Sequence, residues 1–222
     1  KFPFTEKVIG EKLNSYGFQN ISYIKPSSTL KIEKDISITF IPTLNYYGAE
    51  IEIYETISDE FEKAIDTGLI INDLSSRTSH IALCDNTPYL PESGKLIKEL
   101  VPSGFNIGSI WYPFNGAAQD FPLCYDNLEF DEKKKLVKER NIKRNLCILN
   151  LKNFLQSEVL MPYSSDFLLV GKRSDEFLAV HSESLKREWS VKELNLLSKD
   201  NRFKCLNPGD SINFKNKSNS YE

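Results

Sequence analysis

The first half of the chain alternates apolar and polar residues with the two-residue period of β-strands. In the segment 36–42, the side chains of Ile36, Ile38 and Phe40 fall on one face. Before the strands, the pattern predicts a helix that starts at the capping residue Thr5 and stops at Gly17. The strands expected in this half are 21–24, 30–32, 36–42, 50–55, 67–71 and 79–84, the last two being paired through the polar turn 72–78.

The second half alternates strands with helices. Strands followed by such an alternation are typical of a layered α/β (α+β) domain, and the chain has no glycine-rich phosphate-binding motif. We expect one domain over 1–214 and a polar tail over 215–222. The expected helices are 92–101, 131–156 (as one helix or two) and 183–197, and the expected strands are 107–112, 159–161, 167–170 and 211–214.

Charge and composition exclude several classes of partner. The 28 Lys and Arg residues are balanced by 31 Asp and Glu residues, so no general attraction for nucleic acid is expected. The basic run that starts at Lys133 is interrupted by acidic residues, which favours a solvated helix face. No apolar run approaches the roughly 18 residues of a membrane span. Without any Cys-x-x-Cys pair, we expect free buried thiols, and because no signal peptide is visible, we expect a cytoplasmic protein.

The segment 79–86 is the first that can carry chemistry. An apolar strand ends at Cys84 and is followed at once by Asp85 and Asn86. A carboxylate at the carboxyl end of a buried strand lies where sites are commonly built, and it is a suitable zinc ligand. An Asx turn before Pro88 explains the same residues. Both readings stay open.

Two later segments add polar and aromatic groups. Phe114–Tyr125 combines small residues, aromatics and prolines, which build either a pocket wall or a packed irregular loop. Val159–Lys172 predicts a strand, a turn and a strand, with Tyr163 at the turn. The two histidines, His80 and His181, stand a hundred residues apart, and both are expected to have packing, surface or capping roles.

Taken in order, these segments resemble a branch of the metallo-β-lactamase superfamily, the one related to CMP-N-acetylneuraminate hydroxylase and, more distantly, to ascorbate-6-phosphate lactonase. The resemblance covers nearly the whole chain from about Ile36 onward. It implies an αββα sandwich that is incomplete at its amino end, which is also expected from a chain that begins at Lys1 without a methionine. The matching motifs are Cys84-Asp85-Asn86, the loop Phe114–Tyr125, the turn Leu160–Tyr163, the pair Gly171-Lys172 and the segment Leu206–Asp210.

The resemblance also implies a set of metal ligands that this sequence only partly contains. The motif His-x-His-x-Asp-His is not present, and two further histidine positions fall at Asn45 and near Tyr163. Only Asp85 is a residue that can bind metal at a position where the resemblance implies a ligand. Asn45, Asn86, Asn115 and Tyr163 are the predicted substrate-binding residues.

Two functions follow. The first is a metal-dependent, hydrolase-like enzyme for a small polar substrate that carries a sugar or phosphate. Histidines on an amino-terminal segment outside this chain, either joined to it or a separate polypeptide, would complete its zinc or iron site, and the 222 residues alone should hold no stoichiometric metal. The alternative is a metal-free binding protein of the same fold, which Asn45 and Tyr163 favour.

Overall fold

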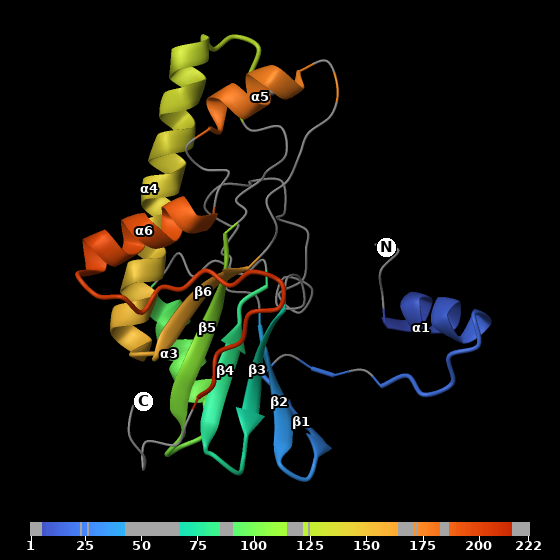
Figure 1. Cartoon of the computed structure of the whole chain (residues 1–222). Helices are drawn as coiled ribbons and strands as arrows, with labels where there is room; N and C mark the ends of the chain where they lie inside the picture. Colours follow the sequence, from blue (N-terminus) through green and yellow to red (C-terminus); the bar gives the residue numbers. More distant parts are fainter. Residues whose placement is uncertain are drawn as a thin grey trace.

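The computed structural model describes residues 6–22, 24–25, 27–42, 67–84, 91–114, 122–123, 125–163, 171, 173–182 and 187–214. These residues form helices and one mixed sheet (Figure 1). The strands are β1 (Thr29–Glu33), β2 (Ile36–Ile41), β3 (Gly68–Asp73), β4 (Thr78–Ala82), β5 (Asn106–Pro113) and β6 (Val159–Tyr163). The helices are α1 (Glu6–Ser15), α3 (Pro91–Leu100), α4 (Phe130–Leu155), α5 (Ser174–Val180) and α6 (Arg187–Ser198).

The six strands lie in the sheet in the order in which they occur along the chain. Neighbours from β1 to β4 are antiparallel, whereas β4, β5 and β6 are parallel. Helices α3 and α4 lie in the crossovers that parallel strands require. As a consequence, β2, β4, β5 and β6 all run in the same direction, and their carboxyl ends lie at one edge of the sheet.

Beyond β6, the chain adds a short extended stretch to the sheet. The N–H of Leu160 donates to the carbonyl of Arg202 at 3.0 Å, and the N–H of Lys204 donates back to the carbonyl of Leu160 at 2.9 Å. The predicted strand 211–214 is wrong, because these residues have no strand pairing. Among the described residues, the last pairing therefore comes earlier than the sequence pattern suggests.

One face of the sheet carries the main core. Figure 1 shows α3, α4 and α6 gathered on this face. Neighbouring strands present Ile70, Ile81, Ile110 and Leu160 in register, and all four side chains are fully buried. They pack in one cluster that includes Ile97 of α3, Ile148, Leu151 and Leu155 of α4, and Leu194 of α6.

The opposite face, which we call the open face, is only partly covered. It presents Leu30, Ile38, Ile71 and His80 as one row across β1 to β4. Leu30 is 39% exposed, Ile71 37%, and Trp111, on the same face of β5, 45%. The segment 205–214 crosses in front of this face (Figure 1), and the ring of Phe214 packs edge-on against His80, with 4.8 Å between centroids.

The buried face of β2 is not the apolar face that the alternation of Ile36, Ile38 and Phe40 predicts. Its buried side chains are Ser37, Thr39 and Ile41, and Ile36 is exposed. The amide of Asn72 donates to the hydroxyls of Ser37 and Thr39, at 3.3 Å each. Its oxygen accepts a hydrogen bond of 2.7 Å from Ser79. The polar side chains tolerate burial because their hydrogen bonds are satisfied within the sheet.

The other predicted elements divide into three groups. The helix that ends near Gly17, the helix 92–101, the pair 67–71 with 79–84 and the strand 107–112 are confirmed to within a few residues, and 131–156 is a single helix. The predicted strand 21–24 is wrong, because residues 21, 22 and 24 have no strand pairing. The predicted strands 50–55 and 167–170 and the tail 215–222 lie outside the described residues.

A second, smaller core lies between α4 and α5, and it includes a helix that the pattern did not predict. Leu123, Val137, Phe177 and Val180 form this cluster. The ring of His181, which follows α5, stacks on Phe177 with centroids 4.2 Å apart. Both histidines therefore have packing roles, as predicted.

Candidate functional site

The predicted site residues are distributed over strands whose carboxyl ends meet. We define the carboxyl edge by the last described residues after β2, β4, β5 and β6, which are Pro42, Cys84, Phe114 and Tyr163. The register aligns Ala82 with Trp111 and Trp111 with Met161, and Pro113 with Tyr163. In open sheets with parallel strands, sites are commonly built at this edge.

Each predicted site residue either ends one of these strands or follows it closely along the chain. Tyr163 is the last residue of β6 and is half-buried, and its substrate-binding role stays a prediction. Asp85 and Asn86 follow Cys84, Asn115 follows Phe114, and Asn45 follows Pro42 by three residues. Asn45, Asp85, Asn86 and Asn115 lie outside the described residues, so their roles stay predictions.

Hydrogen bonds between strands continue up to the carboxyl edge. The N–H of Leu83 donates to the carbonyl of Trp111 at 2.9 Å, and the N–H of Phe114 donates to the carbonyl of Tyr163 at 3.2 Å. Immediately afterwards Cys84 adopts a φ of 52°, in the left-handed region that non-glycine residues avoid. Such strain costs on the order of 1–3 kcal/mol and is more frequent at functional sites. The chain therefore turns sharply just before Asp85.

Helix α4 reaches the same edge through Arg144, a residue that sequence reasoning did not connect to the site. A guanidinium nitrogen of Arg144 donates to the carbonyl oxygen of Phe114. The guanidinium carbon also lies 5.2 Å from the centroid of the Phe114 ring, in the geometry of a cation–π contact. The end of β5 is thus fixed to the middle of the longest helix.

Tyr112 lies on the helix-covered side of β5 and is buried against Phe203, with ring centroids 6.2 Å apart. Burial raises the pKa of Tyr112 above its ordinary value, and the nearby Ser190 hydroxyl and Arg144 only partly oppose this. Among the described residues, neither the Tyr112 hydroxyl nor the Ser190 hydroxyl has a partner in hydrogen-bonding geometry. The raised pKa favours the protonated hydroxyl of Tyr112 at neutral pH.

His80 is not placed as a metal ligand at the carboxyl edge. His80 lies three residues, or roughly 10 Å, before Leu83 along its strand. Its Nδ1 is 2.9 Å from the Ser109 hydroxyl. Burial lowers the pKa of His80, against the opposing influence of Asp73 and Glu158. Within the described part of the chain, no three His, Cys, Asp or Glu side chains group as a metal site.

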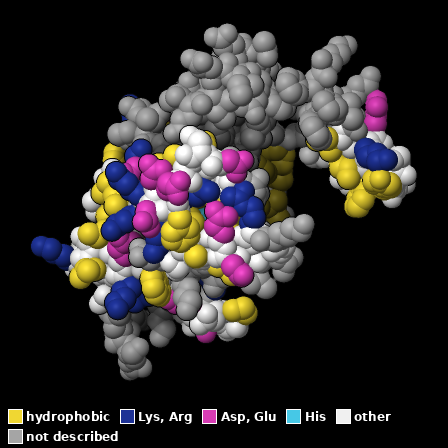
Figure 2. All heavy atoms as spheres, turned by 90° about the horizontal axis from the view of Figure 1, so that it is seen from above, with side chains coloured by type: hydrophobic (Ala, Val, Ile, Leu, Met, Phe, Trp, Pro, Cys, Tyr) yellow, Lys and Arg dark blue, Asp and Glu magenta, His cyan; other side chains and the backbone are white. Residues whose placement is uncertain are grey.

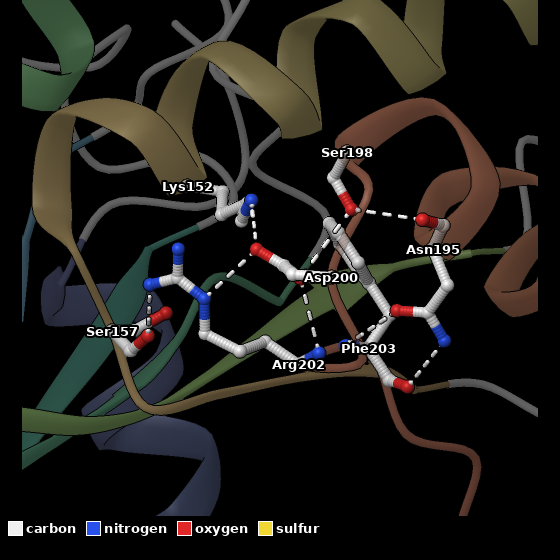
Figure 3. Close-up of polar contacts among 7 residues, drawn as sticks. All are labelled: Lys152, Ser157, Asn195, Ser198, Asp200, Arg202 and Phe203. Carbon is white, nitrogen blue, oxygen red and sulfur yellow. Dashed lines mark hydrogen bonds and ion pairs between the residues drawn. The ribbon is translucent and has the colours of Figure 1, made fainter.

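An ionic cluster lies near the opposite, amino end of β6 (Figure 3). Asp200 accepts from the ammonium of Lys152 and from Nε of Arg202, the latter at 3.1 Å. A second guanidinium nitrogen of Arg202 donates to the carbonyl of Ser157 at 3.1 Å. Burial alone would raise the pKa of Asp200, but hydrogen bonds from Lys152 and Arg202 outweigh it and lower that pKa to about 2. This cluster attaches the stretch after α6 to the sheet.

The charged surface is mixed in sign. Figure 2 shows Lys and Arg side chains interspersed with Asp and Glu on the face viewed from above. On α4, Lys133 is buried and pairs with Glu176 at 3.1 Å, and Lys135 lies 4.0 Å from Glu139. Arg140, Lys143 and Arg144 continue the run. The described part of α4 therefore does not present a continuous basic face, as predicted, while the absence of a nucleic-acid partner stays a prediction.

Comparisons with known proteins identify the fold. No family model matches the chain, and no curated protein matches it. Among solved structures, a mutant of CmlA beta-hydroxylase matches with a TM-score of 0.51 and 14% identity. The match covers 92% of this chain and 37% of that chain. That protein has the metallo-β-lactamase fold.

The chain shares this fold. The predicted class, a layered α+β domain of metallo-β-lactamase type, is therefore confirmed, with the six-stranded sheet and the helices on one of its faces as one half of the layers. At 14% identity the likeness concerns the fold alone. The proposed branch and the proposed chemistry are predictions that need their own tests.

No helix among the described residues is both long enough and apolar enough to cross a membrane. The 26 residues of α4 would be sufficient in length, but Lys, Arg, Asp and Glu occur throughout this helix. The cytoplasmic location stays a prediction. Cys147 is a free, half-buried thiol, and Cys84 and Cys205 are also half-buried.

Proposed function

We propose that this chain is part of a metal-dependent, hydrolase-like enzyme whose site lies at the carboxyl edge and accepts a small polar substrate. One observation carries the proposal. The four strands that precede the predicted site residues run in the same direction and end together. The sugar- or phosphate-bearing nature of the substrate rests on the resemblance to the sialate-hydroxylase and lactonase branch.

The open face supports the second part of the proposal, a further sheet that completes the site. Leu30, Ile71 and Trp111 leave apolar surface on a face that the described helices do not cover. Packed sheets in sandwiches lie about 10 Å apart and bury such faces against one another. We propose that polypeptide outside these 222 residues supplies the covering sheet and carries histidines to the carboxyl edge.

Within this arrangement each residue of the chain has a distinct part. The carboxylate of Asp85 is a zinc or iron ligand, and the incoming histidines complete the set, since one carboxylate cannot hold either ion tightly. A bound ion supplies Lewis-acid activation of water. Tyr163, at the end of β6, and Asn115, which follows β5 in the sequence, orient the substrate by hydrogen bonds. Asn86 and Asn45, which follow β4 and β2 in the sequence, contribute further hydrogen bonds.

The metal-free alternative rests on a specific observation. Tyr163 ends β6 near the position where the resemblance implies a histidine, and a tyrosine hydroxyl is no substitute in an ordinary zinc site. With Asn45 in place of another histidine, the carboxyl edge would then bind a ligand or partner without metal.

Metal analysis of the complete natural polypeptide separates the two functions. We expect at least one equivalent of zinc or iron per chain, and we expect the substitution Asp85→Ala to remove it. Asp126→Ala is the matched control, because the Asp126 side chain is 91% exposed. One full equivalent of metal in Asp85→Ala would refute the ligand role. A metal-free wild-type protein would favour the binding protein.

A further inference from the structure

The segment 205–214, which we call the strap, is well attached in its first half. A guanidinium nitrogen of Arg187 donates to the carbonyl of Leu206 at 3.4 Å. A turn follows, in which the N–H of Asn207 donates to a carboxylate oxygen of Asp210 at 2.8 Å. The N–H of Asp210 donates back to the carbonyl of Asn207 at 3.0 Å. These hydrogen bonds set the path of the strap as far as Asp210.

The second half of the strap, residues 211–214, is held by side chains alone. Within the described part of the chain, its backbone N–H and C=O groups form no hydrogen bond with the sheet. Ile212 and Phe214 are half-buried, whereas Ser211 and Asn213 are exposed. Such alternation places one side of an extended segment against the protein and the other towards solvent. The strap therefore presents unpaired backbone groups along a segment whose apolar side chains are already buried in part.

Phe214 joins the strap to the open face at a place where a glycine leaves room. Its ring packs edge-on against that of His80, with 4.8 Å between centroids. A Cβ on Gly108 would lie 2.9 Å from the His80 ring and 3.3 Å from the Phe214 ring. The Nδ1 of His80 is also 2.9 Å from the Ser109 hydroxyl, which holds the imidazole in place. The strap and the sheet thus meet side chain to side chain, as the facing layers of a β-sandwich do.

The strap and a sheet that covers the open face need the same space. Facing sheets of a sandwich lie about 10 Å apart, which leaves no room for a further stretch of chain between them. Because the strap crosses in front of the open face (Figure 1), a covering layer must either include the strap or displace it. Inclusion keeps the contact between Phe214 and His80 and gives the backbone groups of 211–214 a partner. The contacts therefore favour inclusion.

We propose that residues 211–214 form one edge of the covering layer and that an extended segment of polypeptide outside these 222 residues pairs with them through backbone hydrogen bonds. This inference rests on the covering sheet of the proposed function, and the metal has no part in it. In this mode of recognition, main-chain hydrogen bonds provide affinity and alternate side chains provide specificity. The added segment carries apolar side chains that continue the layer over Leu30 and Ile71, which are exposed on the open face.

Hydrogen exchange followed by mass spectrometry, in the complete natural polypeptide, tests the pairing. We expect the amides of 211–214 to exchange at least about tenfold more slowly than those of an unstructured peptide. Asn213→Pro removes one backbone donor and should abolish this protection. Asn213→Ala is the matched control, because it removes the same exposed side chain but keeps the N–H, and it should leave the protection unchanged.

Two results overturn the inference: exchange of 211–214 at the unstructured rate in the wild type, or equal protection in Asn213→Pro and Asn213→Ala. Should Asn213→Pro fail to fold, the wild-type exchange rate decides alone.

Quenching of Trp111 fluorescence by acrylamide, isolated as the difference between wild type and Trp111→Phe, tests the covering sheet separately. Trp111 is 45% exposed on the open face of this chain, so a covering sheet should shield it. If Trp111 is shielded while 211–214 exchanges freely, the covering sheet stands and only the pairing with the strap is refuted. If acrylamide quenches Trp111 as it quenches an exposed indole, the covering sheet of the proposed function is refuted, and this inference with it.

Discussion

The pair formed by Lys152 and Asp200 allows a quantitative prediction. The side chain of Lys152 is 4% exposed and that of Asp200 is 27% exposed. In Asp200→Asn the ammonium of Lys152 stays buried without its counter-charge, and Arg202 loses its carboxylate partner. Removing one member of a buried ion pair costs about 3–5 kcal/mol. Lowering the Asp200 pKa from 3.8 to about 2 independently corresponds to roughly 2.5 kcal/mol.

Urea unfolding at neutral pH measures the effect. We expect Asp200→Asn to lower the free energy of unfolding by about 2–5 kcal/mol. The control is Glu139→Gln, which removes an exposed pair 4.0 Å from Lys135 and should cost less than about 0.5 kcal/mol. If the two variants lose the same small amount, the buried cluster does not stabilise the fold as argued.

The same pair sets a dependence on pH. Because the folded-state pKa of Asp200 lies below its unfolded value, its stabilisation is complete above the unfolded pKa near 4 and is lost as the pH falls towards about 2. The difference in stability between wild type and Asp200→Asn should therefore shrink over this range. A difference that stays constant from pH 6 to pH 2.5 would contradict the lowered pKa.

Two further substitutions test the packing along β5. Tyr112→Phe should leave the free energy of unfolding unchanged or raise it slightly, because the hydroxyl has no partner among the described residues; a loss of more than about 1 kcal/mol in urea would reveal a hydrogen bond. Gly108→Ala should destabilise by about 1–3 kcal/mol, since its new Cβ would lie 2.8 Å from Thr78 and 2.9 Å from His80; a stability equal to wild type in thermal unfolding would show that the neighbours yield freely.

The local pattern of apolar and polar residues was sufficient to locate most of the described helices and strands. Alternation located the strand pair β3 and β4, and the capping residue and glycine located α1. The pattern did not predict which face of β2 is buried, because hydroxyl groups that form hydrogen bonds with the next strand are buried as readily as apolar groups. It also missed α5, a helix of only seven residues with no side-chain cap at its start.

The site could be predicted only in part from the sequence. The strand before Tyr163 was predicted, although it continues through Tyr163 and does not stop at Met161, and the strand before Asp85 ends at the carboxyl edge, as the sequence suggested. The contact between Arg144 and Phe114 was not predictable, because it joins residues thirty positions apart whose meeting depends on how α4 packs on the sheet. Asp85, Asn45, Asn86 and Asn115 lie outside the described residues.

Anomalous X-ray scattering from crystals of the complete protein, recorded at the zinc and iron edges, tests the central claim most directly. The account predicts a metal peak within about 2.0–2.2 Å of a carboxylate oxygen of Asp85 at the carboxyl edge, with histidine nitrogens around it. A peak elsewhere in the molecule, or an Asp85 carboxylate facing bulk solvent far from Tyr163, would contradict it.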